Sequence, residues 1–258
     1  MTFSRPSDNM RKIFLIYVIC FLIIIEIAYS SMIEVGISEE LKGNISSITY
    51  DNSSNIIKIS IEFYNTGSIA YKTRVKVEFL DKDKVIFNAW SQEKEFMPGD
   101  KKSFDTYWYT NNTGNFFVRL KVYFGNEILE YEKFSFIVNK SLMPEDIFEV
   151  ENFRTYDNYI LFDVKSKEDV EKVIVMPDKY IPGWIFEQRE IDIISKDSSK
   201  LVMLNYYPTL WMPSNISLII TSDKGKYYTE RIFEMKKNKG LIGFFYRLVD
   251  GIRIALFS

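Results

Sequence analysis

The stretch IKISIEF, residues 57–63, decides the fold because apolar and polar side chains alternate along it without a break. Successive side chains of a β-strand point to opposite faces, so this pattern places four apolar groups on one face and three polar groups on the other. The same alternation recurs in VKVEF, residues 75–79, and in VRLKV, residues 118–122. It is typical of antiparallel strands with one face on a core and the other in solvent.

Turn-forming residues separate these runs at regular intervals. They occupy positions 51–55, 65–67, 81–83, 98–100, 111–114 and 125–126. We therefore predict seven strands, at 45–50, 56–64, 72–80, 84–90, 103–109, 116–124 and 128–138. Seven short strands at this spacing predict an immunoglobulin-like antiparallel β-sandwich over residues 44–138.

Residues 146–235 repeat this style with weaker alternation, and we predict a second sandwich there. Its predicted strands lie at 159–164, 170–175, 201–206, 217–222 and 227–233. The tetrapeptide TYDN occurs at 49–52 and again at 155–158, which duplication of one sandwich and chance reuse of a turn sequence both explain. We place the boundary at 139–145, where the pattern is interrupted. The predicted fold is mainly β, with two tandem sandwiches.

Three turn motifs give the first module a resemblance to a known family. Asn65-Thr66-Gly67 closes the second predicted strand, Met97-Pro98-Gly99-Asp100 precedes the fifth, and Gly114 opens the sixth. In these motifs the chain resembles the cell-adhesion-related (CARDB-like) modules, which are immunoglobulin-like repeats of bacterial and archaeal surface proteins. The resemblance covers only residues 44–138 and departs from the family at Phe116 or Phe117, where a Tyr is often seen. It implies a surface protein and brings no catalytic residues.

An apolar run near the start, IFLIYVICFLIII at residues 13–25, predicts a membrane anchor. Thirteen helical residues reach only about 20 Å of a hydrocarbon core of roughly 30 Å, so a span must continue to residue 33. Arg5, Arg11 and Lys12 precede the run, which places residues 1–12 in the cytoplasm and the body outside, in a single-pass protein of the cell membrane. Two alternatives are a signal peptide cleaved after Ala28-Tyr29-Ser30 and a buried core helix.

Residues 240–258 predict a short amphipathic helix. Arg247, Asp250 and Arg253 form one polar stripe, and Lys236, Lys237 and Lys239 precede the segment. Apolar side chains cover much of the remaining surface of this helix: Leu241, Phe244, Phe245, Leu248, Val249 and Ile252. This pattern predicts docking in a membrane interface, with lipid as the partner. Packing on the second sandwich or on a partner protein, and a second membrane span, are the alternatives.

Composition excludes several classes of function. The chain has no histidine and a single cysteine, Cys20, which argues against imidazole bases, cysteine–histidine dyads, thiolate zinc sites and intramolecular disulfides. Residues 32–235 carry 25 basic and 32 acidic side chains, whereas nucleic-acid binding needs a basic surface. We therefore expect no nucleic acid, no cofactor and no required metal. The richness in Ile, Lys, Asn and Glu resembles that of proteins from methanogenic archaea.

Two groups of residues are candidate surface sites. Five glycosylation sequons begin at Asn44, Asn52, Asn111, Asn139 and Asn215, all in predicted turns or at strand edges. The aromatic loops of the second module offer Tyr180, Trp184, Tyr207 and Trp211, which suit stacking on sugar rings or anchoring of a protein. The alternative for Trp184 and Trp211 is that they close the ends of the core.

Carboxylate pairs suggest two further chemistries, each with a plainer explanation. Calcium favours oxygen ligands such as those of Asp81 with Asp83 or Asp100 with Asp105, although such pairs are ordinary in turns. Glu187, Glu190 and Asp192 suggest a glycosidase, but nothing in the sequence indicates a raised pKa for any of them.

The sequence favours a non-enzymatic structural or interaction protein of the cell surface. Its expected partner is another surface or envelope protein. A glycan- or peptide-binding module that uses the aromatic loops is the second hypothesis. A subunit of an envelope or filament machine is the third; Arg11-Lys12-Ile13 replaces the processing site expected before the hydrophobic run of archaeal pilins.

Overall fold

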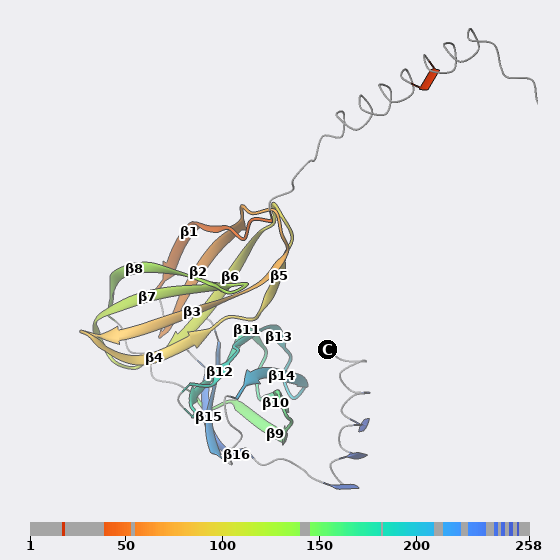
Figure 1. The fold of residues 1–258 in the computed structure, drawn as a ribbon. Coiled ribbons are helices and arrows are strands. Elements are labelled where there is room, and N and C mark those ends of the chain that lie inside the picture. Colours follow the sequence, from red (N-terminus) through yellow and green to blue (C-terminus); the bar gives the residue numbers. More distant parts are fainter. Residues whose placement is uncertain are drawn as a thin grey trace, which may run out of the picture. The chain divides into compact units, whose positions relative to one another are not determined.

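The computed structural model describes residues 17–18, 39–52, 55–139, 145–181, 183–208, 214–222 and 227–235, with seven positions between 240 and 252. Glu40–Ser258 forms one compact unit, separate from Met1–Glu39. Sixteen β-strands make up most of this part, in two antiparallel β-sandwiches that follow one another along the chain (Figure 1). The predicted class, mainly β with antiparallel sheets, is confirmed.

The first sandwich has one sheet in the order β1-β2-β6 and another in the order β4-β3-β7-β8, with β5 also paired to β3. Its strands are β1 (Gly43–Asp51), β2 (Ile56–Asn65), β3 (Tyr71–Asp81), β4 (Lys84–Trp90), β5 (Lys94–Phe96), β6 (Lys101–Tyr109), β7 (Gly114–Phe124) and β8 (Glu127–Val138). All seven predicted strands are present. The three-residue strand β5 was missed because it is too short to display alternation.

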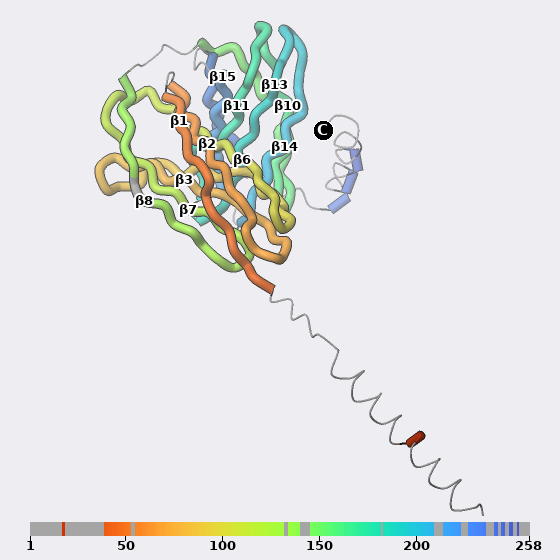
Figure 2. Tube along the Cα trace, turned by 90° about the horizontal axis from the view of Figure 1, so that it is seen from above, coloured from red at the N-terminus to blue at the C-terminus, as the bar shows by residue number. Residues whose placement is uncertain are grey.

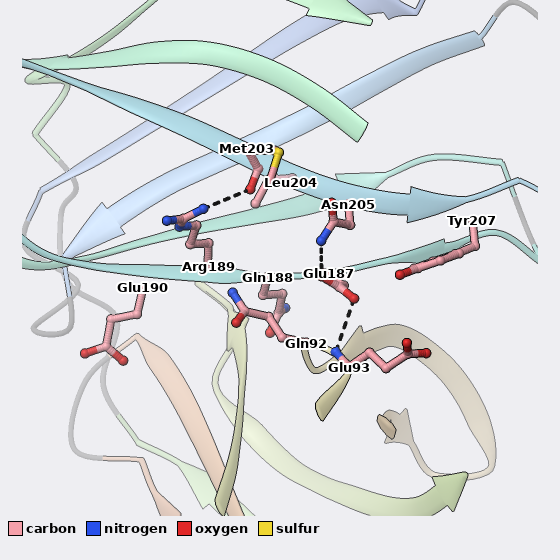
Figure 3. A pocket seen from close by; sticks show the side chains of 10 residues that line it. All are labelled: Gln92, Glu93, Glu187, Gln188, Arg189, Glu190, Met203, Leu204, Asn205 and Tyr207. Atoms are coloured by element: carbon pink, nitrogen blue, oxygen red, sulfur yellow. Dashed lines mark hydrogen bonds between the residues drawn. The ribbon is translucent and has the colours of Figure 1, made fainter. Parts of the chain in front are cut away.

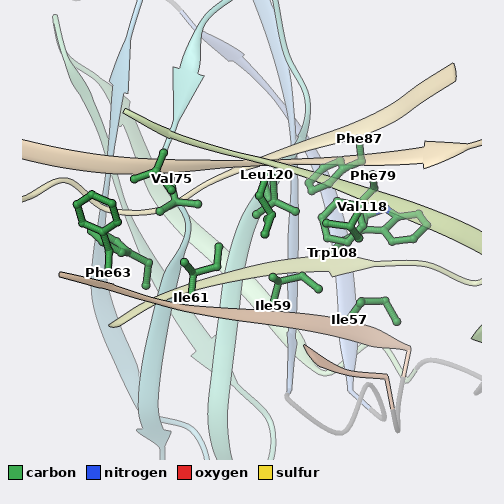
Figure 4. Packing of buried hydrophobic residues seen from close by; sticks show 14 of the residues in the cluster. Ile57, Ile59, Ile61, Phe63, Val75, Phe79, Phe87, Trp108, Val118 and Leu120 are labelled. Carbon is green, nitrogen blue, oxygen red and sulfur yellow. The ribbon is translucent and has the colours of Figure 1, made fainter. Parts of the chain in front are cut away.

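The alternating run at 57–63 forms β2, and its apolar side chains all enter the core. Ile57, Ile59, Ile61 and Phe63 are each fully buried. Figure 4 shows them facing side chains of β3 and β7 in the opposite sheet, among them Val75. The two sheets therefore share one core, as the pattern predicted.

The second sandwich repeats the strand order of the first. Its sheets run β9-β10-β14-β12 and β13-β11-β15-β16. Its strands are β9 (Phe148–Thr155), β10 (Tyr159–Ser166), β11 (Val170–Lys179), β12 (Ile185–Phe186), β13 (Arg189–Ile194), β14 (Ser199–Tyr207), β15 (Ser214–Ser222) and β16 (Tyr228–Met235). In chain order β9, β10, β11, β13, β14, β15 and β16 hold the positions of β1, β2, β3, β4, β6, β7 and β8. Each copy of TYDN lies at the end of the first strand of its sandwich.

Three strands of the second sandwich were missed by the sequence prediction, which gave five where the structure has eight. Strand β12 has only two residues. Strand β9 has an irregular register with β10 and contains Asn152 at a φ of 53°, so its side chains do not alternate. Strand β13 lies at the edge of its sheet and mixes charged with apolar side chains. Edge strands of this kind carry a weak sequence signal.

Candidate functional site: the junction of the two sandwiches

Several long-range side-chain interactions among the described residues join the two sandwiches. Strands β3, β4 and β6 of the first sandwich contribute to this junction, together with β11, β13, β15 and the residues before β13 of the second. Figure 2 shows the two sandwiches side by side, and Tyr107 of β6 bonds to Glu190 of β13. The interactions are of three kinds: a buried ion pair, a side chain that bonds to a strand edge, and an apolar cluster.

The ion pair links Arg74 of β3 to Glu187, which precedes β13. Arg74 Nη2 lies 3.4 Å from Glu187 Oε1 and 3.2 Å from Glu93 Oε2, and both Arg74 and Glu187 are more than nine-tenths buried. The guanidinium also lies over the Tyr207 ring, 4.1 Å from its centroid. Glu187 further accepts hydrogen bonds from Asn205 Nδ2 at 2.9 Å and from the Glu93 amide at 3.2 Å (Figure 3).

Burial dominates the electrostatics of Glu187. It raises the pKa of this carboxyl above its usual value, although Asn205, Arg74 and the Glu93 amide all favour the ionised form. No local pattern in the sequence indicated this shift, because the neighbours responsible for the burial are remote along the chain. An ion pair in such surroundings specifies geometry more than it adds stability.

The second element is the side chain of Gln188, which bonds to the backbone of β6. Its Oε1 accepts a hydrogen bond from the Tyr107 amide at 2.7 Å, and its Nε2 donates one to the Tyr107 carbonyl at 2.6 Å. Gln188 thus bonds to both the amide and the carbonyl of Tyr107, which would otherwise need a neighbouring strand as partner. Beside it, the Tyr107 hydroxyl donates to Glu190, and the Gln188 amide donates to the Trp90 carbonyl at 3.3 Å.

The third element is an apolar cluster that both sandwiches supply. It consists of Ile56, Tyr107 and Tyr109 from the first sandwich with Ile174, Met176 and Ile219 from the second. Tyr109 also stacks on Tyr228 of β16, with ring centroids 4.7 Å apart and planes 11° apart. Burial of six such side chains makes the junction resemble a small core rather than a hinge.

A polar cavity of about 570 Å³ opens at the junction, between Gln92 and Glu93 on one side and residues 187–190 with β14 on the other. Two of the three carboxylates suggested for a glycosidase, Glu187 and Glu190, line it, whereas Asp192 does not. Figure 3 shows them pointing in different directions, and each already has partners in the protein. This arrangement leaves no carboxylate pair converging on a bond between two sugars.

Of the four aromatic residues suggested for ligand binding, Tyr180 and Trp184 line one cavity and Tyr207 lines another. Trp184 is 2% exposed and stacks on Tyr206 at 5.3 Å, so it closes the core of the second sandwich, as the alternative interpretation predicted. Tyr180 is half-buried and lies against Phe186. Tyr207 is 39% exposed and faces the polar cavity, under Arg74. Trp211 lies outside the described residues.

The structure distinguishes among the five sequons. Asn44, Asn139 and Asn215 are exposed. Asn52 Nδ2, the atom that a glycan would modify, donates a hydrogen bond to the Ile137 carbonyl at 2.7 Å. Asn111 is exposed, but its Oδ1 accepts from Asn55 at 2.7 Å and from Tyr109 at 3.0 Å. We therefore expect Asn52 to be the poorest acceptor in the folded protein.

The suggested calcium pair of Asp100 and Asp105 is engaged by the protein itself. Asp100 pairs with Lys102 at 2.8 Å and accepts from the Met97 amide, whereas Asp105 pairs with Lys58 at 3.0 Å. Within the part of the chain that the structure describes, no group of three or more acidic or cysteine side chains is placed to hold a metal ion.

The two terminal segments are described only in part. Tyr17 and Val18 are helical, and the remainder of the predicted anchor at 13–33 lies outside the described residues. Among the residues described, no helix is both long and apolar enough to cross a membrane. At the other end the described positions are also helical, and all six large apolar side chains are exposed: Leu241, Phe244, Phe245, Leu248, Val249 and Ile252. Arg247 and Arg253, of the same predicted helix, lie outside the described residues.

No family model matches the chain, and no curated protein matches it. Solved structures with a similar arrangement of strands include a transglutaminase from red sea bream, at 8% identity and a TM-score of 0.28, which covers 77% of this chain. The chain spans only 32% of that enzyme. The N-terminal periplasmic domain of ScsB from Proteus mirabilis matches at 10% identity and a TM-score of 0.28, over 74% of this chain and 92% of that domain. A chain of the Salmonella enterica SafA pilin–SafB chaperone complex matches at 11% identity and a TM-score of 0.26, over 76% of this chain and 97% of that chain.

The residues that build the junction were largely missed by sequence reasoning. Arg74 and Gln188 drew no attention, and Glu187 was considered only as a catalytic acid. Their partners lie 81 to 113 positions away in the sequence. One signal was available: VIVM at 173–176 and the run at 216–220 carry apolar residues on both faces. Such runs indicate strands that are covered on both sides.

Proposed function

We propose that this chain is a membrane-anchored, extracytoplasmic structural or interaction protein of the cell surface without enzymatic activity. In this proposal residues 13–33 form the anchor, and two immunoglobulin-like modules form one rigid body outside the cytoplasm. The amphipathic segment at 240–258 adds a second contact with the membrane. The partner is another surface or envelope protein, as the resemblance to the CARDB-like modules suggests.

The exposure of the C-terminal apolar side chains carries the proposal. Phe244 and Phe245 are 62% and 60% exposed, and Leu241 is 78% exposed. Side chains of this size in adjacent turns form an apolar stripe that water solvates poorly. Lys236, Lys237 and Lys239 precede the stripe in the sequence, and this charge suits an anionic lipid surface.

The junction supports the role of a rigid body. A buried ion pair, a side-chain-to-strand bond and an apolar cluster fix one sandwich on the other, so loops of both modules keep a constant relation. Two membrane attachments on one such body hold it close to the bilayer, because the second attachment is intramolecular.

Two experiments test this proposal. Protease applied to intact cells is expected to remove a C-terminal tag, and survival of the tag in intact but not in lysed cells excludes an extracytoplasmic body. For the second contact, a chain that begins at Glu40 is expected to sediment with anionic lipid vesicles. Replacing Phe244, Phe245 and Leu248 by Glu is expected to abolish this sedimentation.

The matched control for the vesicle experiment is Ile232→Glu. Ile232 is 68% exposed on β16, so the substitution removes a comparable apolar side chain from a different surface. We expect Ile232→Glu to sediment like the unchanged chain. Equal loss in both variants contradicts docking through residues 240–258.

A further inference from the structure

A second cavity at the junction, of about 430 Å³, has the features of a small-molecule site. It lies between β3 and β4 of the first sandwich and the segment that joins β11 to β12 of the second. Trp90, Tyr180 and Trp184 contribute to its walls, with polar groups from Asn88, Asp178 and Lys76. A volume of this order, aromatic walls and a few polar groups are typical of ligand pockets.

The aromatic walls are held from behind. Trp184 stacks on Tyr206 at 5.3 Å, Tyr180 packs edge-on against Phe186 at 5.2 Å, and Trp90 lies 5.4 Å from Tyr123. Each ring therefore keeps its position without a ligand, so little side-chain freedom is lost on binding. Trp90 and Trp184 are more than nine-tenths buried, which leaves Tyr180 as the most accessible ring of the three.

The polar groups of the cavity suit hydroxyl groups. Asn88 Oδ1 has no hydrogen-bond partner among the described residues, and a buried acceptor in this state is costly. Burial raises the pKa of the Tyr180 phenol to about 12, so it remains a donor. Its hydroxyl lies 3.5 Å from the Asn88 carbonyl. Burial also raises the pKa of Asp178.

The charges that line the cavity are neutralised within the protein. Lys76 pairs with Glu78 at 2.6 Å. Lys179 lies 4.0 Å from Asp178 and 3.8 Å from Glu230. A strongly charged ligand such as a phosphate or an ammonium group therefore finds no unpaired counter-charge here. The cavity favours a neutral molecule.

We propose that this cavity binds a neutral sugar of one or two pyranose rings, with the Tyr180 ring against a face of the sugar and Asn88 and Asp178 hydrogen-bonded to its hydroxyl groups. This site uses Tyr180 and Trp184 of the aromatic loops considered in the sequence, but not Tyr207, which faces the other cavity. The proposal does not require membrane attachment. It stands or fails independently of the proposed function.

The test is a titration of the full-length protein in detergent with a panel of neutral sugars: glucose, galactose, mannose, N-acetylglucosamine and their β1,4- and α1,4-linked disaccharides. We expect at least one of them to bind saturably with a Kd of about 1 mM or tighter, measured by calorimetry. At ten times its Kd, that sugar should raise the Tm by about 3 °C, because both sandwiches contribute to the site.

Variants locate the site. Asn88→Ala should weaken binding by about fivefold or more, since it removes a hydrogen-bonding group. Tyr180→Leu removes the ring that packs on the sugar and should weaken binding by at least as much. Asn88→Ala keeps the junction contacts described above, so its Tm without sugar should change little. Tyr207→Phe, in the other cavity, should bind like the unchanged protein. Equal weakening by Tyr207→Phe overturns the assignment.

Two further arms distinguish the source of the sugar and complete the test. Methyl glycosides and tetrasaccharides of the preferred sugar are compared with the free sugar: tighter binding of the tetrasaccharide indicates a surface polysaccharide, and equal or weaker binding indicates a free sugar. Glucuronic acid and glucose 6-phosphate serve as charged probes. The proposal is overturned if either charged probe binds more tightly than the neutral sugars. It is also overturned if no neutral sugar binds at a concentration of about 10 mM.

Discussion

Strands β2 and β11 each have a neighbouring strand on both sides in their sheets, and their burial patterns explain why one sandwich was easier to predict than the other. In β2, buried and less buried residues alternate over most of the strand, because one face packs on the core and the other meets solvent. In β11, five consecutive residues from Val173 to Pro177 are buried. One face of β11 packs on its own core, and the other, with Ile174 and Met176, packs on the first sandwich.

The comparison shows that alternation is weak in the second sandwich because some of its strands are covered on both faces. It does not mean that these segments form strands poorly. Strand β15 has the same character, with seven buried residues in succession. Runs of this kind are ambiguous in a sequence, because a strand covered on both faces and a buried helix both produce them. Four predictions test whether the junction is the cause.

The largest effect is expected from Arg74→Ala. Removal of the guanidinium leaves Glu187 buried without its charged partner, which should cost about 3–5 kcal/mol of unfolding free energy at pH 7. Urea unfolding of the purified protein and of the variant measures this difference in unfolding free energy. The cost should shrink as the pH falls, because burial raises the pKa of the Glu187 carboxyl and so favours its uptake of a proton. Lys72→Ala removes an exposed partner of Glu93 and should change stability by less than about 1 kcal/mol. A loss in Arg74→Ala no larger than that in Lys72→Ala contradicts the role of the ion pair.

The next effect is expected from Ile174→Ala and Ile219→Ala. Both side chains belong to the cluster between the sandwiches, so each truncation should cost about 2–4 kcal/mol although neither residue lies in a sandwich core. Ile128→Ala, at a position 54% exposed on β8, should change stability by less than about 0.5 kcal/mol. Equal, small effects in all three variants would mean that the outer face of β11 and β15 is not covered.

A smaller effect is expected from Gln188→Ala. The substitution leaves the Tyr107 amide and carbonyl without their partner and should cost about 1–3 kcal/mol. Hydrogen exchange gives a local readout, because protection of the Tyr107 amide should fall while that of the Ile59 amide within β2 persists. Gln92→Ala changes an exposed glutamine at the same junction and should leave both amides protected.

The smallest effect is a difference in pH dependence between Glu187 and Glu78. Burial raises the pKa of Glu187, so the native state disfavours its ionised form, and the protein should lose stability relative to Glu187→Gln as the pH rises above 4.5. Burial also tends to raise the pKa of Glu78, but hydrogen bonds from Lys76 and Arg119 outweigh it and lower that pKa. Stability from Glu78 should therefore be lost as the pH falls below 4.5. Unfolding midpoints of the protein and both glutamine variants from pH 3 to 7 measure the two slopes, and slopes of the same sign contradict this account.

Alternation of apolar and polar residues predicted the strands that have one buried and one exposed face. The strands that were missed lack this pattern for physical reasons. The run at 57–63 and its two counterparts lie where alternation placed them. Strands β5 and β12 are too short to carry a pattern, and β9 and β13 are edge strands without clear alternation. The two copies of TYDN lie at the ends of β1 and β9, with three residues in the strand in the first copy and one in the second.

The junction could not be predicted because its partners are distant and chemically ordinary. Gln188 is one of several polar residues between two apolar runs, and nothing near it in the sequence indicates that its amide meets Tyr107. Glu187 was noticed only because it is a carboxylate near two others. Side-chain pairs across 81 to 113 positions are decided by how the sheets pack, which period and turn chemistry do not specify.

The bonds that Gln188 makes to β6 have one more consequence. Because contacts far from the interdomain linker hold the halves together, the covalent connection at 140–144 serves mainly to keep their local concentration high. A chain cut there should remain a complex through gel filtration, and the two pieces, produced apart, should reassemble when mixed. The molecule would then behave as a heterodimer whose subunits happen to be encoded in one reading frame.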